Sequence, residues 1–476
     1  MRWGKLTEER RTLLVLGAIT LFGAAIRASS LTAQSLWFDE IVSWEQSRGT
    51  FLELLTRTAQ DNYPPLQNIL IAISMRLFGE GAFGIRLPAL LLGIATVPAI
   101  YALTSLAGNR TAGLLAAFIV AVSPFLIWYS QEGRMYALLA LSATVFGWSV
   151  LRYITAPVPT RPWWMLGSGV ALLYSHYFGP LDWISILAGA GVITLVFLKR
   201  WRRLFALAAW QVIPALAFLP WAAVLLNRAK TLTDEGFWIP SISAVSVIDN
   251  LWNLMSGSYG MLLILIGLVA LVWPRMRSDA QLPVPLQPPH LLFMAIAAVL
   301  PIVLGIMTSL LVEPVLLGRY IIGSLPPFVA LAAIGLVRLA GRVMLRRLVV
   351  AAVTVFCLVM AYRYGWQPPK QDWRAAARVV ASQSAQTDCV VVTPAYFRSS
   401  LLYYLGDPPT CLVTPNDRGD PVALPASAHR VIGVFPEPES AKIASGFPDT
   451  IWEREDLSVR RIGVIAFTRK DAAPGG

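Results

Sequence analysis

The chain has 476 residues, of which 56% are apolar and only 14% are charged, and its formal net charge is +12. This composition excludes a disordered chain, which is poor in apolar and aromatic residues, and a single soluble globule, which could not bury so much apolar surface. The apolar residues gather in runs such as 12–26, 86–106 and 291–312, each near the roughly 20 residues that span a bilayer. These runs lack the alternation of membrane β-strands. The sequence therefore predicts a polytopic α-helical membrane protein.

The excess of basic residues has two interpretations, nucleic-acid binding and orientation in a membrane. The basic residues lie in short loops between apolar runs, where Lys and Arg set the orientation of the spans. We therefore expect no nucleic-acid partner. Arg2, Lys5, Arg10 and Arg11 precede the first apolar run without a convincing cleavage site, which favours an uncleaved first span and a cytoplasmic N-terminus.

Eleven apolar stretches are predicted to cross the membrane. They are 12–30, 86–106, 110–128, 135–156, 163–180, 181–198, 204–226, 259–274, 290–312, 319–338 and 347–363. A further stretch, 64–80, is marginally short for a span and carries Gln67, Asn68 and Arg76. If it crossed, every later basic loop would face outward, against the positive-inside rule. We therefore expect 64–80 to lie in the outer interface or to re-enter the membrane against protein.

This topology predicts a transmembrane domain over 1–363, with 31–85 as a large first extracytoplasmic loop that carries surface helices. The segments 129–134, 228–258 and 313–318 are expected on the same side. Residues 364–476 would form a soluble extracytoplasmic domain of normal size.

This C-terminal domain is expected to be α/β, because short apolar strands alternate with polar helical segments. Helices are predicted for 373–384 and 399–405, and strands for 389–393, 431–435 and 462–467. Cys389 and Cys411 lie in a compartment that permits disulfides, and two interpretations stay open, a disulfide bridge or two buried free thiols.

Two acidic positions in the first loop are candidates for chemistry. Asp39 and Glu40 follow Trp37 and Phe38 just beyond the first span. Asp39 is either a general base or the N-cap of an amphipathic stretch over 40–58.

Further along the same loop, Asp61 and Tyr63 precede Pro64-Pro65. Their side chains could contact a polar substrate group. Alternatively, the motif is purely structural, because the proline pair stiffens an extended entry into the following helix.

Two short outer loops place arginines at span ends. Glu132, Arg134 and Tyr136 lie in the second outer loop, and Arg319 and Tyr320 follow Glu313-Pro314. The alternatives are a solvated ion pair and snorkelling toward lipid phosphates, or recognition of a substrate phosphate by the forked guanidinium groups. His176, at the end of the fifth predicted span, is more often a packing residue than a ligand.

Together these residues predict one outer-face cavity, lined by carboxylates and arginines and walled by apolar side chains. Such a cavity suits a substrate with an anionic leaving group and a lipid tail. The sequence has neither paired histidines nor a Gly-rich nucleotide loop. No clear metal-ligand set is present, so we assign no cofactor.

The order of several motifs resembles the GT-C membrane glycosyltransferases of the protein O-mannosyltransferase and aminoarabinose transferase type (glycosyltransferase family 39-like), and above all the bacterial predicted membrane-bound mannosyltransferases. The resemblance covers nearly the whole chain. The motifs that carry it are Trp37-Phe38-Asp39-Glu40, Asp61-Asn62-Tyr63-Pro64-Pro65-Leu66, Phe83-Gly84-Ile85-Arg86-Leu87-Pro88, the segment from Tyr129 to Tyr136, Arg319-Tyr320 with Pro326-Pro327, and Asp372-Trp373-Arg374.

The resemblance implies inverting sugar transfer from a polyprenyl-phosphate carrier on the extracytoplasmic face of the cell membrane. It makes Asp39 the catalytic base with Glu40 as its neighbour, and it places Arg134 and Arg319 near the carrier phosphate. Tyr320 is expected beside them, and Asp61, Tyr63, Glu132, Tyr136 and His176 are expected to contact substrate. Many relatives have His-Pro-Pro-Leu where this chain has Tyr63-Pro64-Pro65-Leu66, and a tyrosine can donate a hydrogen bond but cannot carry a positive charge.

The implied acceptors are protein hydroxyls, cell-envelope glycans or glycolipids. Some GT-C relatives use a divalent cation, while the mannosyltransferase branch is expected not to. The alternative function from another class is a membrane transporter or lipid-linked sugar flippase, although transporters often carry internal repeats and this sequence has no obvious one.

Overall fold

The structure is a computed structural model. It describes residues 8–61, 63–158, 160–235, 239–272, 287–339, 351, 355, 359, 370–384, 388–414, 428–436 and 447–470.

The chain divides into two compact units. The first unit comprises Met1–Ser29, Gln46–Gly79 and Arg86–Trp366, and the second comprises Ser30–Glu45, Glu80–Ile85 and Gln367–Gly476. The second unit thus contains the C-terminal segment that the sequence predicts as a separate domain. It also contains two pieces of the first loop, which the sequence analysis assigns to the transmembrane domain.

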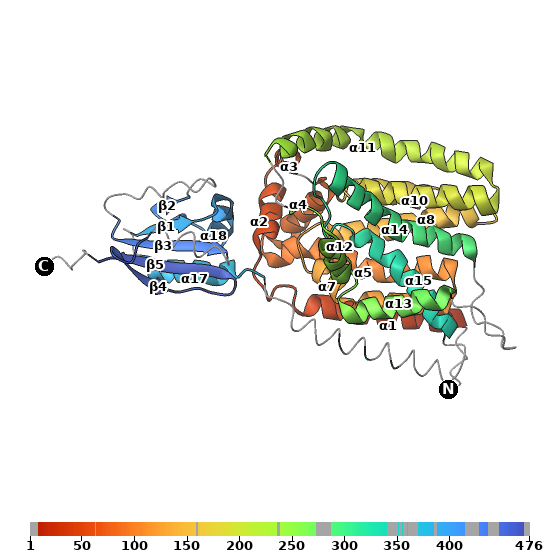
Figure 1. The fold of residues 1–476 in the computed structure, drawn as a ribbon, viewed down its shortest axis with the longest axis horizontal. Helices are drawn as coiled ribbons and strands as arrows, with labels where there is room; N and C mark the ends of the chain where they lie inside the picture. Colours follow the sequence, from red (N-terminus) through yellow and green to blue (C-terminus); the bar gives the residue numbers. More distant parts are fainter. Residues whose placement is uncertain are drawn as a thin grey trace. The chain divides into compact units, whose positions relative to one another are not determined.

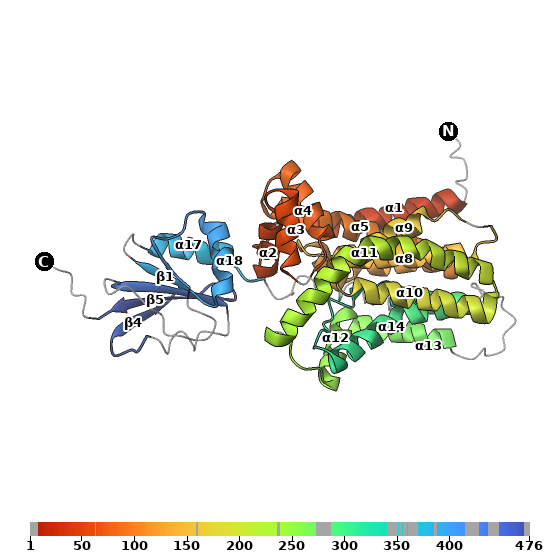
Figure 2. The same ribbon diagram turned by 90° about the horizontal axis from the view of Figure 1, so that it is seen from above.

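The first unit is built almost entirely of helices, which Figures 1 and 2 show from two directions. Its elements are α1 (Glu8–Ser29), α3 (Phe51–Ala59), α4 (Leu66–Phe78), α5 (Ala82–Ala107), α6 (Arg110–Val122), α7 (Pro124–Ser130), α8 (Tyr136–Thr155), α9 (Trp163–Leu173), α10 (Gly179–Ile193), η1 (Thr194–Leu198), α11 (Trp201–Glu235), α12 (Ala244–Leu254), α13 (Ser258–Val272), α14 (Pro288–Leu311), η2 (Ile322–Ser324) and α15 (Leu325–Leu339). Helix α10 packs against both α8 and α14, and α15 packs against α6, α13 and α14.

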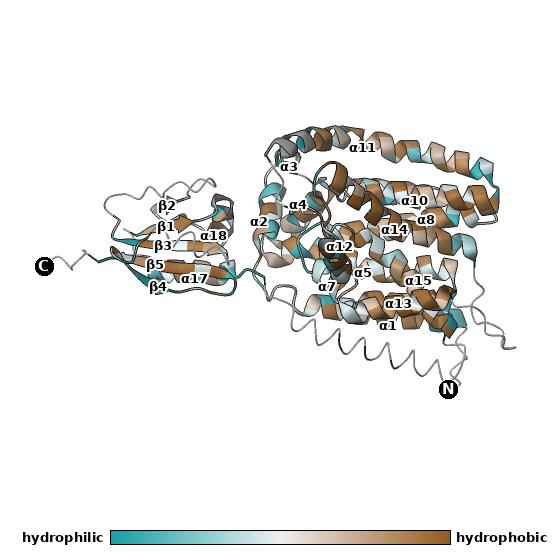
Figure 3. Ribbon diagram, viewed as in Figure 1, coloured by the Kyte–Doolittle hydropathy of each residue, from teal (hydrophilic) through white to brown (hydrophobic). Residues whose placement is uncertain are grey.

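Among the described residues, seven helices are long and apolar enough to cross a membrane, or eight if the bent pair α6–α7 forms one span. Apolar residues dominate these helices, as Figure 3 shows in brown, and large apolar side chains such as Leu216 and Leu311 are exposed on them, as lipid contact requires. The chain is thus a multi-pass membrane protein. Helices α9 and α13 are shorter, and most of the predicted span 347–363 lies outside the described residues. The count of eleven spans therefore stays a prediction.

The predicted span 110–128 is broken into α6 and α7, which meet at an angle of 60°. Pro124 has no N–H to donate, so the helical hydrogen bonding is interrupted there. The buried Arg27 guanidinium of α1 donates to the Val120 and Ala121 carbonyls at 2.9 and 2.7 Å. It also donates to the Ser130 hydroxyl at 3.2 Å. Arg27 therefore joins three helices at the bend.

We expect Arg27→Met to destabilise the protein by about 3 kcal/mol, because it leaves buried carbonyls without their donor. The midpoint of thermal unfolding in detergent measures this loss. Arg110→Met, at an exposed position of α6, is the control and should change the midpoint little. Equal midpoints for the two variants would contradict this structural role.

The first-loop stretch predicted as one amphipathic helix over 40–58 forms two helices. Helix α2 (Phe38–Ser47) ends before Gly49, whose φ of +82° is a left-handed conformation that favours glycine. Thr50 then caps α3, and Glu53 completes the capping box. The following helix α4 has only 13 residues, about 20 Å, which is too short for a span.

The second unit contains a five-stranded sheet of order β2-β1-β3-β5-β4. Its elements are α17 (Trp373–Gln383), β1 (Cys389–Val392), η3 (Ala395–Phe397), α18 (Arg398–Leu405), β2 (Cys411–Val413), β3 (Arg430–Pro436), β4 (Trp452–Asp456) and β5 (Ile462–Arg469). Strand β1 is parallel to β2 and β3, whereas β5 is antiparallel to β3 and β4. The predicted α/β architecture is confirmed, together with both helices and three strands. Strands β2 and β4 were not predicted from the sequence.

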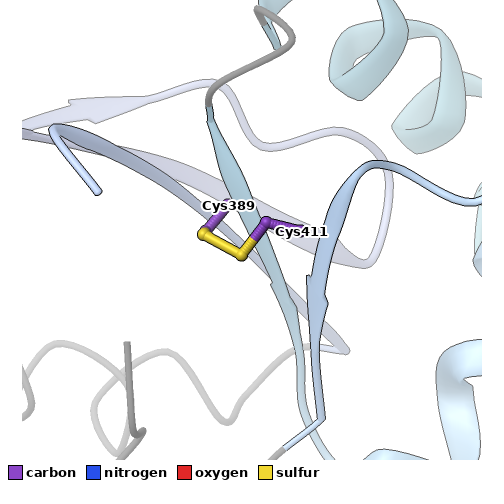
Figure 4. Close-up of a disulfide and its surroundings, with 2 residues drawn as sticks. All are labelled: Cys389 and Cys411. Atoms are coloured by element: carbon purple, nitrogen blue, oxygen red, sulfur yellow. A yellow bond between two sulfur atoms is a disulfide. The ribbon is translucent and has the colours of Figure 1, made fainter. Parts of the chain in front are cut away.

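The two faces of this sheet bury different clusters. On one face Val390, Ile432 and Val464 pack against α17 and α18, while on the other face Val391 packs with Phe467. This alternation follows from the two-residue period of a strand. Cys389 and Cys411 are paired across β1 and β2 and form a disulfide (Figure 4).

Candidate functional site

Asp39 is the second residue of α2 and is half-buried. The backbone N–H groups of Glu40 and Ile41 donate to the Trp37 carbonyl at 3.0 and 3.1 Å, so the helix begins before Asp39. The interpretation of Asp39 as the N-cap of 40–58 is therefore wrong. Its carboxylate lies in the first helical turn, where the helix dipole favours negative charge.

Glu40 differs from its neighbour because it is fully buried. Its Oε2 accepts a hydrogen bond from Lys370 Nζ at 3.2 Å, in an ion pair whose two side chains are 0% and 5% exposed. The same oxygen accepts from the Trp37 N–H at 3.4 Å. Glu40 is thus held inside the second unit.

A second group of predicted residues meets in the first unit, where two guanidinium groups lie over tyrosine rings. Arg134 is 4.8 Å from the centre of the Tyr63 ring. Arg319 is 5.3 Å from the Tyr320 ring and 5.9 Å from the Tyr136 ring. The Tyr63 and Tyr320 hydroxyls are 3.0 Å apart, within hydrogen-bond distance. We call these residues, together with His176, the arginine–aromatic cluster.

His176 lies in the turn between α9 and α10, and its ring contacts three tyrosine rings of this cluster. Its ring centre is 4.8 Å from that of Tyr320, 5.2 Å from that of Tyr63 and 6.0 Å from that of Tyr136. Its Nδ1 accepts the Phe178 N–H at 3.0 Å, so the ring proton of neutral His176 is on Nε2. Among the described residues, no partner accepts a hydrogen bond from this buried Nε2.

The pKa of His176 is well below its ordinary value because the ring is buried, and the charges of Arg134 and Arg319 lower it further. Burial likewise raises the pKa of Tyr63 well above that of a free phenol. At neutral pH the cluster therefore offers two cations beside neutral hydroxyl and imidazole groups. This is a suitable environment for an anion that needs both charge and directed hydrogen bonds.

We expect His176→Gln to reduce the loss of stability in mild acid. Unfolded chains bind a proton at histidine below about pH 6.5 while native His176 stays neutral, so wild-type stability falls as the pH drops from 7 to 5. Thermal unfolding at both pH values measures the difference. His429→Gln, at an exposed position, should keep the wild-type pH dependence. An equal loss in His176→Gln would contradict the neutral state of this histidine.

The remaining predicted residues of the first unit lie in different surroundings. Asp61 accepts a hydrogen bond from the Gln46 amide at 2.7 Å, and Asn68 of α4 donates to that amide's oxygen at 2.8 Å. Asp61 thus belongs to a hydrogen-bond network within the first unit that joins Gln46 to α4. Glu132 is buried, two residues before Arg134.

Tyr177 was not predicted as a site residue, yet its ring stacks on His176 with centres 4.3 Å apart and lies 5.2 Å from the ring of Tyr320. Its position beside His176 was the available signal. Within the described ranges, no three His, Cys, Asp or Glu side chains gather closely enough to hold a metal ion.

Comparison with solved structures defines the fold. The crystal structures of ArnT from Cupriavidus metallidurans in the apo state and bound to undecaprenyl phosphate align with TM-scores of 0.62 and 0.60 at 15% and 16% identity. The alignments cover 97% of this chain and 98% and 99% of those chains. The oligosaccharyltransferase of Archaeoglobus fulgidus, crystallised with Zn and sulfate, aligns with a TM-score of 0.56 at 13% identity, over 96% of this chain and 73% of that one. No curated protein sequence matches the chain significantly.

The chain has the fold of the GT-C membrane glycosyltransferases. Residues 62–231, which include Tyr63, Arg134 and His176, match the model of the family described as dolichyl-phosphate-mannose-protein mannosyltransferase. The fold of the whole chain and the family match over 62–231 thus confirm the resemblance inferred from its motifs.

Proposed function

We propose that this glycosyltransferase moves a sugar, with inversion, from a polyprenyl-phosphate-linked donor to an acceptor on the extracytoplasmic face of the cell membrane. The observation that carries the proposal is the arginine–aromatic cluster, in which Arg134 and Arg319 lie over tyrosine rings. Arg134 is within the segment 62–231 that matches the family. The similar ArnT structure that contains undecaprenyl phosphate supports a lipid phosphate as the ligand.

In this proposal Arg134 and Arg319 bind the donor phosphate, with Tyr320 beside them. Guanidinium groups suit a phosphate because their donors form a fork that matches two of its oxygens. His176 adds the N–H of its Nε2 as a neutral donor. Tyr63 and Tyr136 contact the donor through the same cluster, while Glu132 and Asp61 contact polar groups of the substrates.

We assign Asp39 as the general base. Its carboxylate takes the proton of the acceptor hydroxyl while the acceptor oxygen bonds to the anomeric carbon. The bond from that carbon to the phosphate oxygen breaks, and the electron pair leaves with the polyprenyl phosphate. Arg134 and Arg319 stabilise the charge of this leaving group. One displacement inverts the anomeric carbon, so no covalent glycosyl-enzyme intermediate forms.

The orientation proposed for the chain has a cytoplasmic N-terminus and an extracytoplasmic C-terminal domain. The Cys389–Cys411 disulfide supports it, because disulfides persist outside the reducing cytosol. The distribution of Lys and Arg supports it as well. A divalent cation has no ligand set among the described residues, and no step of the proposal involves one.

Reconstitution of the purified protein in lipid vesicles tests the proposal. The vesicles contain one polyprenyl-phosphate sugar at a time from a panel of hexoses and pentoses, with a hydroxyl-bearing peptide or glycan as acceptor. We expect release of polyprenyl phosphate and a product of inverted anomeric configuration by NMR. Movement of intact donor between leaflets, without cleavage for any sugar, would instead support the flippase alternative.

A further inference from the structure

The first-loop segment 34–45 is built into the second unit together with the C-terminal domain. We propose that this unit positions the catalytic base: the buried Glu40–Lys370 pair and the contacts around it fix the first turn of α2 and thereby the carboxylate of Asp39. This inference rests on the proposed function, in which Asp39 is the base. It makes Lys370 a positioning residue and gives the C-terminal domain a role in the reaction.

The backbone before α2 is fixed by three hydrogen bonds to the C-terminal domain. The Ser35 hydroxyl donates to the Gln371 carbonyl at 2.6 Å, and the Lys370 N–H donates to Gln34 Oε1 at 2.9 Å. The Leu36 N–H donates to the Tyr404 hydroxyl at 2.6 Å. The chain therefore enters the helix from a fixed position.

The first residue of α2 is held by aromatic packing. The Phe38 ring lies 5.0 Å from Phe397 and 5.2 Å from Tyr396, measured between ring centres. Phe397 in turn stacks on the fully buried Trp373 at 5.3 Å. Phe38 thus belongs to the cluster that covers one face of the sheet.

Glu40 fixes the turn that presents Asp39. Its Oε2 binds both the Lys370 ammonium and the N–H of Trp37, so the ion pair holds the very start of the helix. Asp39 is adjacent on the same turn, so fixing the backbone at Glu40 also fixes the direction in which the Cα–Cβ bond of Asp39 points. A buried ion pair contributes little net stability compared with apolar packing, so stability alone is a weak explanation for it.

The far end of the segment is fixed as well. The Trp44 indole N–H donates to Glu80 Oε2 at 2.8 Å, and the Tyr403 hydroxyl donates to the Glu80 carbonyl at the same distance. The Ser399 hydroxyl donates to Glu45 Oε1 at 2.8 Å. Contacts at both ends leave the helix turn of Asp39 little freedom within this unit.

The test compares Lys370→Met with Lys370→Arg in the full-length protein reconstituted in lipid. A misplacement of about 1 Å costs on the order of a hundredfold in rate, so we expect Lys370→Met to lower kcat about 10- to 100-fold while the KM for donor stays unchanged. Lys370→Arg keeps the cation and should retain most of the wild-type kcat. Tyr404→Phe removes the hydroxyl that accepts the Leu36 N–H and should lower kcat severalfold. This variant tests the proposal if Lys370→Met fails to fold.

Val391→Ala is the matched control, because it weakens the opposite face of the same sheet. It should lower the unfolding midpoint without lowering the kcat of the folded protein. Wild-type kcat in both Lys370→Met and Tyr404→Phe would overturn the inference, as would an equal loss in Val391→Ala. If Asp39→Asn is inactive while Lys370→Met and Tyr404→Phe keep the wild-type kcat, the positioning role of Lys370 is rejected and the proposed function stands. If Asp39→Asn keeps its activity, the base assignment of the proposed function fails.

Discussion

Asp39→Asn is expected to lower the kcat for sugar transfer by about 10²–10⁴-fold, the range that a general base contributes. Asparagine has nearly the size of aspartate and fits the first turn of α2, but it cannot take up the acceptor proton. Donor binding should remain unchanged, because in the proposed reaction Asp39 contacts the acceptor hydroxyl rather than the phosphate. Turnover of a polyprenyl-phosphate sugar by the reconstituted variant, beside a titration of donor affinity, measures both quantities.

Asp407→Asn provides the control for this substitution, since it makes the same change at an exposed position of the second unit. It should leave kcat at the wild-type value. Retained turnover in Asp39→Asn would reject Asp39 as the base.

Arg134→Met is expected to weaken the binding of undecaprenyl phosphate by about 10- to 100-fold, because a hydrogen bond between charged groups contributes about 1.5–3 kcal/mol. Arg319→Met should have a similar effect. Arg134→Lys should recover only part of the affinity, since an ammonium group cannot reproduce the guanidinium fork. Isothermal titration or a fluorescent lipid-phosphate competition assay measures the dissociation constants.

Arg152→Met is the matched control for the proposed phosphate site. Arg152 also lies over an aromatic ring, 5.3 Å from the centre of Trp148, but it is at the C-terminal end of α8, whereas Tyr136 begins that helix. Its loss should not change donor affinity. Wild-type affinity in both Arg134→Met and Arg319→Met would exclude a phosphate role for this cluster.

The apolar runs predicted most helices because lipid contact requires long apolar segments. The breaks within these runs were harder to predict. The predicted span 163–180 contains the end of α9 at Leu173 and the turn that carries His176. The polar run Tyr174-Ser175-His176-Tyr177 marks this interruption, but it was interpreted as the end of a span. Similarly, Pro124 sits in an apolar run, and its bend depends on Arg27, which donates to carbonyls more than 90 residues away along the chain.

In the candidate site, too, some residues could be predicted from the sequence and others could not. Arg134 and Arg319 stood out because outer arginines at span ends oppose the orientation rule, and the structure brings both onto tyrosine rings of one cluster. The different surroundings of Asp39 and Glu40 could not be predicted, because they are neighbours of identical charge. Only the fold reveals that Lys370, 330 residues further along the chain, binds Glu40.

The shared membership of residues 30–45 and 367–476 in one unit has a consequence for biogenesis. A ribosome synthesises the first of these segments before the intervening helices of the first unit, and the second after them. Glu40, on the helix turn of Asp39, therefore has no ion-pair partner until the intervening helices have been synthesised and Lys370 follows. The nascent chain can therefore thread its helices through the bilayer before the Glu40–Lys370 contact exists, so in our proposal the turn of Asp39 becomes fixed only after Lys370 has been synthesised.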